Sequence, residues 1–106
     1  MITYKATGIV LGNCWGGGTC GYAAETIRAT NRASLVQQIE NGLKDGSLDS
    51  GMGYESLIGA IMVVETIDTR KIDGKVFTAI DYEDEFFGDV TPEQEEMLMD
   101  AKFYSQ

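Results

Sequence analysis

The sequence contains no histidine and only two cysteines, and these scarcities exclude several common active sites. Without histidine, neither a Ser–His nor a Cys–His nucleophile pair can be built. A zinc site needs four ligands, so Cys14 and Cys20 cannot complete one from Cys and His within one chain. A carboxylate pair could serve as acid and base, yet 106 residues leave little room for a deep pocket. We therefore predict a protein that is not an enzyme and holds no cofactor.

The sequence also has no long hydrophobic run, and we expect no secretory leader. Its longest apolar run, 58–64, includes a glycine and is far shorter than the roughly 18 residues of a membrane-spanning helix. The first eight residues carry neither the basic nor the apolar region of a signal peptide. We expect no membrane association and a cytoplasmic location, in which Cys14 and Cys20 are normally reduced.

Basic residues are few, with eight Lys and Arg against 17 Asp and Glu, for a net charge of -9. Such a chain is repelled by DNA, RNA and anionic lipid, so direct nucleic-acid binding is the least expected of the common functions. Nine of the acids lie between Asp81 and Asp100, where there is no base, and the other eight acids balance the eight bases. The net charge of the chain therefore equals that of this acidic segment, 81–100.

The remaining composition predicts one folded domain, 1–106. Hydrophobic residues make up 43% of the chain, which is sufficient for a single core. Capping residues predict helices that begin after Asn31 and after Thr91, and Asp73-Gly74 is typical of a two-residue hairpin turn. The expected strands are 2–11, 22–29, 60–69 and 75–86, with 54–59 left open between helix and strand. The order ββαββα predicts an α+β fold, in which an antiparallel sheet of about four strands packs against two helices.

Alternation along the last expected strand places three acids of the segment on one face. Asp81, Glu83 and Glu85 would follow one another at intervals of about 7 Å, and like charges in such a row repel. One interpretation is a solvated edge strand that is protected by charge. A second is a row that binds a Lys/Arg-lined groove of another protein, in competition with a phosphate backbone. A third is a divalent-cation site, to which Asp84 would add another oxygen ligand.

Apolar side chains are interleaved with these acids. Four residues of the last expected helix form an apolar face that should pack on the sheet: Met97, Leu98, Ala101 and Tyr104. Met99 and Phe103 project roughly opposite. They are either scattered surface residues or anchors for a partner or a second copy of the chain, with the acids as a polar rim.

The glycine-rich segment 13–21 is expected to reverse the chain between the first two strands. Cys14 and Cys20 flank this loop and could face each other within disulfide reach. Trp15 either folds over the core or acts as an exposed binding anchor.

The sequence as a whole favours a non-enzymatic, acidic protein-binding domain that occupies a basic groove of a partner, such as a nucleic-acid-binding one. In size, acidity and lack of a catalytic constellation the chain is similar to phage- and plasmid-encoded inhibitor proteins, including anti-CRISPR and antirestriction proteins. The alternatives are a small-molecule or divalent-cation-binding domain and a homo-oligomeric structural module such as a homodimer. The candidate partner-binding residues are Asp81, Glu83, Asp84, Glu85, Glu96, Asp100, Phe86, Phe87, Met99, Phe103 and Trp15; no residue is assigned as catalytic or as a metal ligand.

Overall fold

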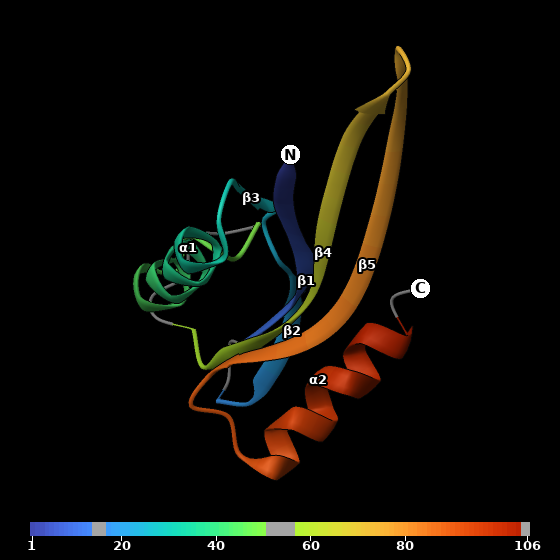
Figure 1. The fold of residues 1–106 in the computed structure, drawn as a ribbon. Helices are drawn as coiled ribbons and strands as arrows, with labels where there is room; N and C mark the ends of the chain where they lie inside the picture. The colour runs from blue at the N-terminus through green and yellow to red at the C-terminus, as the bar shows by residue number, and fades with distance from the viewer. Residues whose placement is uncertain (14–16, 51–56, 105–106) are drawn as a thin grey trace.

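The computed structural model describes residues 1–13, 17–50 and 57–104. Within these ranges the chain forms five strands and two helices, and every strand pairing is antiparallel. The elements are β1 (Ile2–Asn13), β2 (Thr19–Ala23), β3 (Ile27–Ala29), α1 (Arg32–Asp45), β4 (Gly59–Ile72), β5 (Lys75–Gly88) and α2 (Pro92–Tyr104) (Figure 1). The predicted α+β class is confirmed, and the predicted ββαββα order is matched except that the second strand is divided into β2 and β3.

Strand β1 lies inside the sheet, with β4 and then β5 on one side and both β2 and β3 on the other. Ile9 pairs with Ala23 and Ala6 with Ile27, so three steps along β1 match four steps along its neighbour. The extra residue is a β-bulge between β2 and β3. Because the bulge shifts the alternation by one, side chains from both strands and the bulge pack against the same core: Tyr22, Ala24, Ile27 and Ala29.

The two helices cover opposite faces of the sheet (Figure 1). Buried residues of α1 share one core with Ala6, Val10 and Met62, which belong to one face of β1 and β4. Leu98 of α2 instead packs with Leu11 and Ile61, whose side chains alternate onto the other face. The α1 side therefore holds the larger core and the α2 side a smaller one.

Helix α1 follows the predicted signals closely. The side chain of Asn31 caps it by accepting a hydrogen bond from the backbone N–H of Ser34 at 2.8 Å. Leu35, Ile39 and Leu43 are buried along one stripe, and Gly46 ends the helix with a φ of 80°.

Helix α2 begins as predicted but packs differently. Thr91 and Gln94 form a reciprocal capping box, with the Gln94 N–H donating to Thr91 Oγ1 at 3.2 Å and the Thr91 N–H to Gln94 Oε1 at 2.9 Å. Leu98 is the one fully buried residue of the helix. Met97 is 36% exposed and its sulfur contacts the Thr19 hydroxyl of β2 at 3.9 Å, whereas the expectation that Tyr104 packs on the sheet was wrong, since its exposed fraction is 81%. At about 100° per residue Tyr104 lies roughly opposite Lys102, which contacts Asp84 of β5, so the Tyr104 ring is directed away from the sheet.

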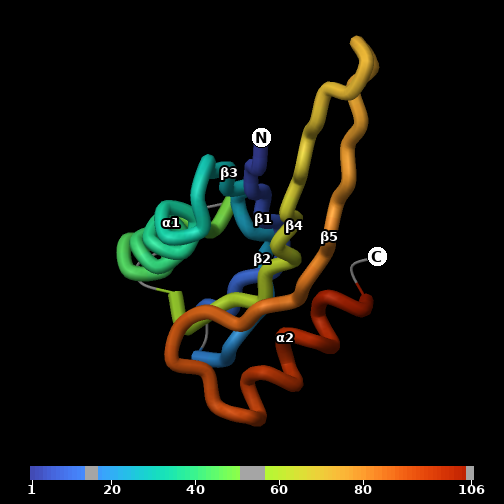
Figure 2. The backbone as a smooth tube through the Cα atoms, viewed as in Figure 1, coloured from blue at the N-terminus to red at the C-terminus, as the bar shows by residue number. Residues whose placement is uncertain are grey.

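Strands β4 and β5 form a long hairpin that projects from the rest of the molecule (Figure 2). The predicted turn at Asp73-Gly74 is confirmed, and the φ values of 51° and 77° are those of the turn type that matches strand twist. Ile2 is the last residue of β1 to pair with β4, at Asp68. Beyond that point the hairpin is essentially two-stranded, and the molecule measures 59 × 25 × 22 Å along its principal axes.

Strands β1 and β2 pair as far as Asn13 and Thr19, which confirms the predicted chain reversal. Cys20 is disulfide-bonded, contrary to the expected reduced state. Cys14 and Trp15 lie outside the described residues. Of the segment 54–59, which was left open between helix and strand, residues 54–56 also lie outside the described residues, and Gly59 is the first residue of β4. Neither described helix has the length and apolar character needed to cross a membrane.

Candidate functional site

The acids of β5 are divided between the two faces of the sheet. Glu85 and Glu83 pair across the hairpin with Met62 and Val64, which are core residues beneath α1. Asp81 follows two residues earlier on the same face. The predicted row of three carboxylates is therefore present on the α1 side, and Asp84 lies on the α2 side.

Two of these four acids form ion pairs with the helices. Glu85 contacts the guanidinium of Arg32, the first residue of α1, where the positive end of the helix dipole also favours a carboxylate. Asp84 accepts a hydrogen bond from Lys102 of α2 at 2.6 Å. Glu85 and Asp84 therefore help attach α1 and α2 to the edge of the sheet. Asp81 and Glu83 form no ion pair with any described residue.

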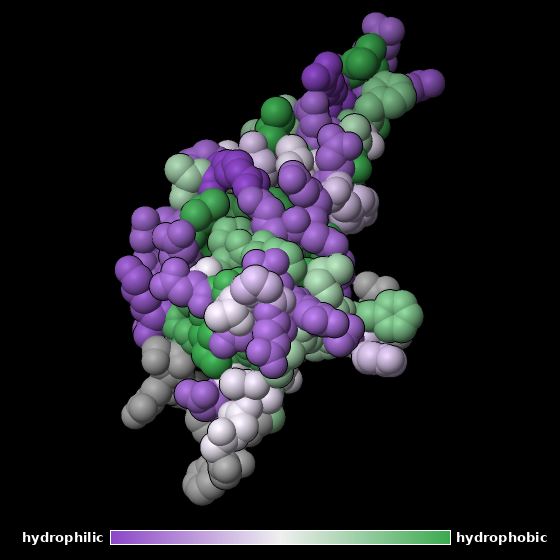
Figure 3. Space-filling view, turned by 90° about the horizontal axis from the view of Figure 1, so that it is seen from below, coloured by the Kyte–Doolittle hydropathy of each residue, from purple (hydrophilic) through white to green (hydrophobic). Residues whose placement is uncertain are grey.

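Helix α2 gathers four of the candidate residues on one exposed face. Glu96, Met99, Asp100 and Phe103 are spaced at i, i+3, i+4 and i+7, so they lie together on the side opposite Leu98. The exposed fractions of Met99 and Phe103 are 44% and 72%. We call these four residues the outer face of α2. The space-filling view from below likewise shows hydrophobic side chains between hydrophilic ones (Figure 3).

The two phenylalanines of β5 differ in accessibility. Phe87 is 7% exposed and belongs to the core under α1, so its assignment as a partner-binding residue was wrong. Phe86, on the other face of the strand, remains 38% exposed. Alternation from Glu85 already places Phe87 on the α1 side, so this burial follows once α1 is known to cover that face.

The candidate residues therefore form two surfaces rather than one. Asp81 and Glu83 lie on the α1 side of β5, and the outer face of α2 lies beyond the opposite side of the sheet. No described group of three or more Asp, Glu or Cys side chains could hold a metal ion. On β5 this is a consequence of alternation, which directs Asp84 away from Asp81, Glu83 and Glu85.

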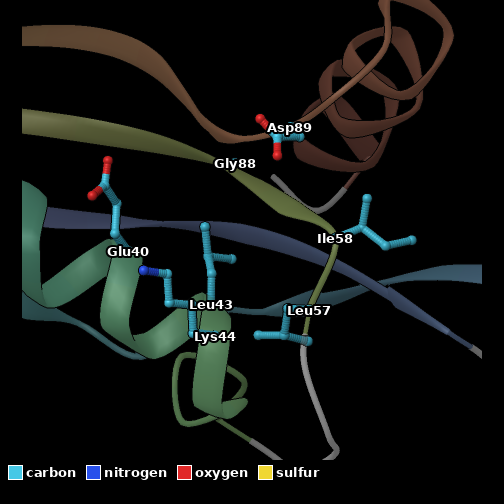
Figure 4. Close-up of a pocket in the computed structure, with 7 residues that line it drawn as sticks. All are labelled: Glu40, Leu43, Lys44, Leu57, Ile58, Gly88 and Asp89. Atoms are coloured by element: carbon cyan, nitrogen blue, oxygen red, sulfur yellow. The ribbon is translucent and has the colours of Figure 1, made fainter.

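A depression of about 410 Å³ lies between the end of α1 and the connection from β5 to α2 (Figure 4). Leu43, Leu57 and Ile58 supply its apolar part, and Glu40, Lys44 and Asp89 place charges of both signs at its rim. Among the described residues that line it there is no serine, threonine or cysteine that could act as a nucleophile. The arrangement suits packing of connecting segments better than recognition of a ligand of one charge.

Sequence reasoning missed a cluster of bases at the tip of the β4–β5 hairpin. Arg70, Lys71 and Lys75 lie within six residues around the turn, although the chain has only eight bases. Arg70 contacts Asp68 at 2.9 Å, and the hydrogen bond and charge of this carboxylate raise the pKa of the guanidinium. Lys71 and Lys75 form no ion pair with any described residue. The signal was visible in the sequence as three bases within six residues around the predicted turn.

No family model, no curated protein and no solved structure matches this chain.

Proposed function

We propose that this protein is a non-enzymatic protein-binding domain that binds a basic protein through the outer face of α2. The observation that carries the proposal is the shared exposure of Glu96, Met99, Asp100 and Phe103 on one helix face. Large apolar side chains with a charged rim are the usual composition of a binding surface in which a few residues provide most of the affinity.

The charge of the chain supports a basic partner. The net charge of -9 equals that of the acidic segment 81–100, which includes most of α2, and the one base of α2, Lys102, contacts Asp84. Electrostatic complementarity accelerates association and suppresses binding to acidic proteins, and added salt weakens it. Met99 and Phe103 would supply the part of the affinity that salt does not remove.

A narrower form of the proposal is an inhibitor that occupies a nucleic-acid-binding groove in the cytoplasm. Carboxylates on a helix can replace phosphates in contacts with Lys and Arg of such a groove, and duplex DNA would then compete with this protein for the partner. Competition by duplex DNA tests this form separately from partner binding itself.

The experiment is capture of proteins from the native host's lysate on the immobilised protein, at low and at high salt. Two double variants test the surface: Glu96→Lys with Asp100→Lys, and Met99→Ala with Phe103→Ala. Glu25→Lys with Glu40→Lys changes the net charge equally, at exposed sites outside α2, and is the matched control.

We expect the immobilised protein to capture basic proteins at low salt and to release them at high salt. The control variant should capture the same proteins, and the variant with Glu96→Lys and Asp100→Lys should not. Loss of Met99 and Phe103 should weaken capture about thirtyfold or more, as for a residue pair at the centre of an interface. Equal loss with the control variant, or capture of no basic protein, would overturn the proposal.

A further inference from the structure

Strand β5 is the free edge of the sheet. It pairs with β4 along its whole length, and no other described strand lies on its outer side. Residues 75–84 are all exposed, and they include large apolar side chains on both faces: Val76, Phe77, Ile80 and Tyr82. An edge with free backbone N–H and C=O groups is a template for another strand.

The charges along this edge have opposite signs at its two ends. Lys75 lies at the tip of the hairpin, beside Arg70 and Lys71 of β4, and Asp81 and Glu83 lie nearer the body of the sheet. Antiparallel pairing of two identical strands reverses one against the other. It would therefore place the basic tip of each copy beside the acidic part of its partner.

We propose that a second copy of this chain pairs antiparallel along β5, with Ala79 at the two-fold axis and Lys75 opposite Glu83. The dimer would have one continuous sheet that crosses both copies, and every contact between two different residues would occur twice, once on each side of the axis. This inference goes beyond the proposed function, because the interface uses neither Met99 nor Phe103.

The acids limit the possible registers. Shifting the axis to Asp81 would place this carboxylate opposite itself, and shifting it one residue further would place Asp81 opposite Glu83, which repels. An axis at Ile80 would direct Lys75 to Glu85, whose carboxylate already contacts Arg32. An axis at Ala79 gives Lys75 a carboxylate that has no ion-pair partner among the described residues.

The same register matches the apolar side chains. Residues equally distant from Ala79 lie opposite each other, so Val76 would contact Tyr82 and Thr78 would contact Ile80 on the α2 side. Aromatic and β-branched side chains are favourable neighbours across antiparallel strands. Pairing would also give the two-stranded part of the hairpin a third strand, which an isolated hairpin needs for stability.

Sedimentation equilibrium over micromolar to hundreds of micromolar protein tests the charge pair. Lys75→Glu creates two symmetric repulsive pairs, and we expect the dissociation constant of the dimer to rise about thirtyfold, which corresponds to about 2 kcal/mol. The double variant Lys75→Glu with Glu83→Lys restores attraction and should restore the dimer. Lys44→Glu makes the same charge change on α1 and should leave the dimer intact, and circular dichroism verifies the fold of each variant.

Cross-linking tests the register. Directly opposed Cα atoms in antiparallel strands are about 4.5–5.5 Å apart, which is within the range of a disulfide. Ala79→Cys should therefore give a covalent dimer under mild oxidation that reductant reverses, and Lys71→Cys, one strand inside the edge, should not. A monomer at all concentrations, a dimer indifferent to Lys75→Glu, or equal cross-linking by both cysteine variants would overturn the proposal.

Discussion

Replacing Leu98 with alanine removes the one fully buried side chain of α2. Leu98 is 0% exposed and contacts a small core that contains two other buried residues, Leu11 and Ile61. Leucine-to-alanine changes at buried sites cost about 2–5 kcal/mol, depending on how far the surroundings close the cavity. Half-buried Ile9 and Val90 border this core and can move into the space. We therefore expect the free energy of unfolding to fall by about 2–3 kcal/mol.

Urea unfolding measures this loss, and hydrogen exchange shows where it acts. The amides of α2 should lose protection in Leu98→Ala, and those of β1 and β4 should keep theirs, because the larger core lies on the other face of the sheet. Met99→Ala is the control at an exposed site of the same helix and should change stability by less than about 0.5 kcal/mol. A loss below about 1 kcal/mol, or unchanged protection of α2, would refute the reasoning. The helix would then be held chiefly by polar contacts such as the one between Lys102 and Asp84.

Two further predictions concern charged groups. A double-mutant cycle with Arg32→Ala and Glu85→Gln should give a coupling free energy of about 1 kcal/mol in urea unfolding, because both side chains are partly exposed. A coupling free energy near zero would show that solvent screens the ion pair. Hydrogen bonds from the side chain and backbone of Ser47 lower the pKa of Asp45 from its usual 3.8. The stability that this carboxylate adds is therefore fully present above pH 3.8, and it is lost as the pH falls through the pKa of the folded state. Asp45→Asn should therefore reduce the pH dependence of the urea midpoint below about pH 4. Near pH 7 the pH dependence should be the same in the variant and the original protein.

The elements of the fold could be predicted because their signals are local. Asn31 and Thr91 cap helices through side-chain hydrogen bonds to amides three residues away, and Asp73-Gly74 fits one turn type. The bulge between β2 and β3 could not be predicted, because it depends on register against β1. The same is true of Tyr104, whose exposure depends on which side of α2 meets the sheet.

The candidate site was predictable only in part for the same reason. Period-two alternation along β5 is a local property, so the row of Asp81, Glu83 and Glu85 followed from sequence. The partner of Glu85, Arg32, is 53 residues away, and only the tertiary structure brings the two together. Which acids are committed to ion pairs within the fold therefore depends on which helix covers which face.

The bulge between β2 and β3 determines which substitutions and deletions are compatible with the fold at residues 25 and 26. Its backbone is held by the segment 48–50, since the Glu25 N–H donates to the Leu48 carbonyl at 2.7 Å and Ala24 forms a bridge with Asp49. The side chains of Glu25 and Thr26 are exposed, so many amino acids can occupy these positions. Deleting either residue would restore unbroken alternation from Ala24 to Ile27, and Ile27 would remain opposite Ala6 beneath α1. At this point of the chain evolution can therefore change the residue type, or remove one residue, without moving Ile27 out of the core.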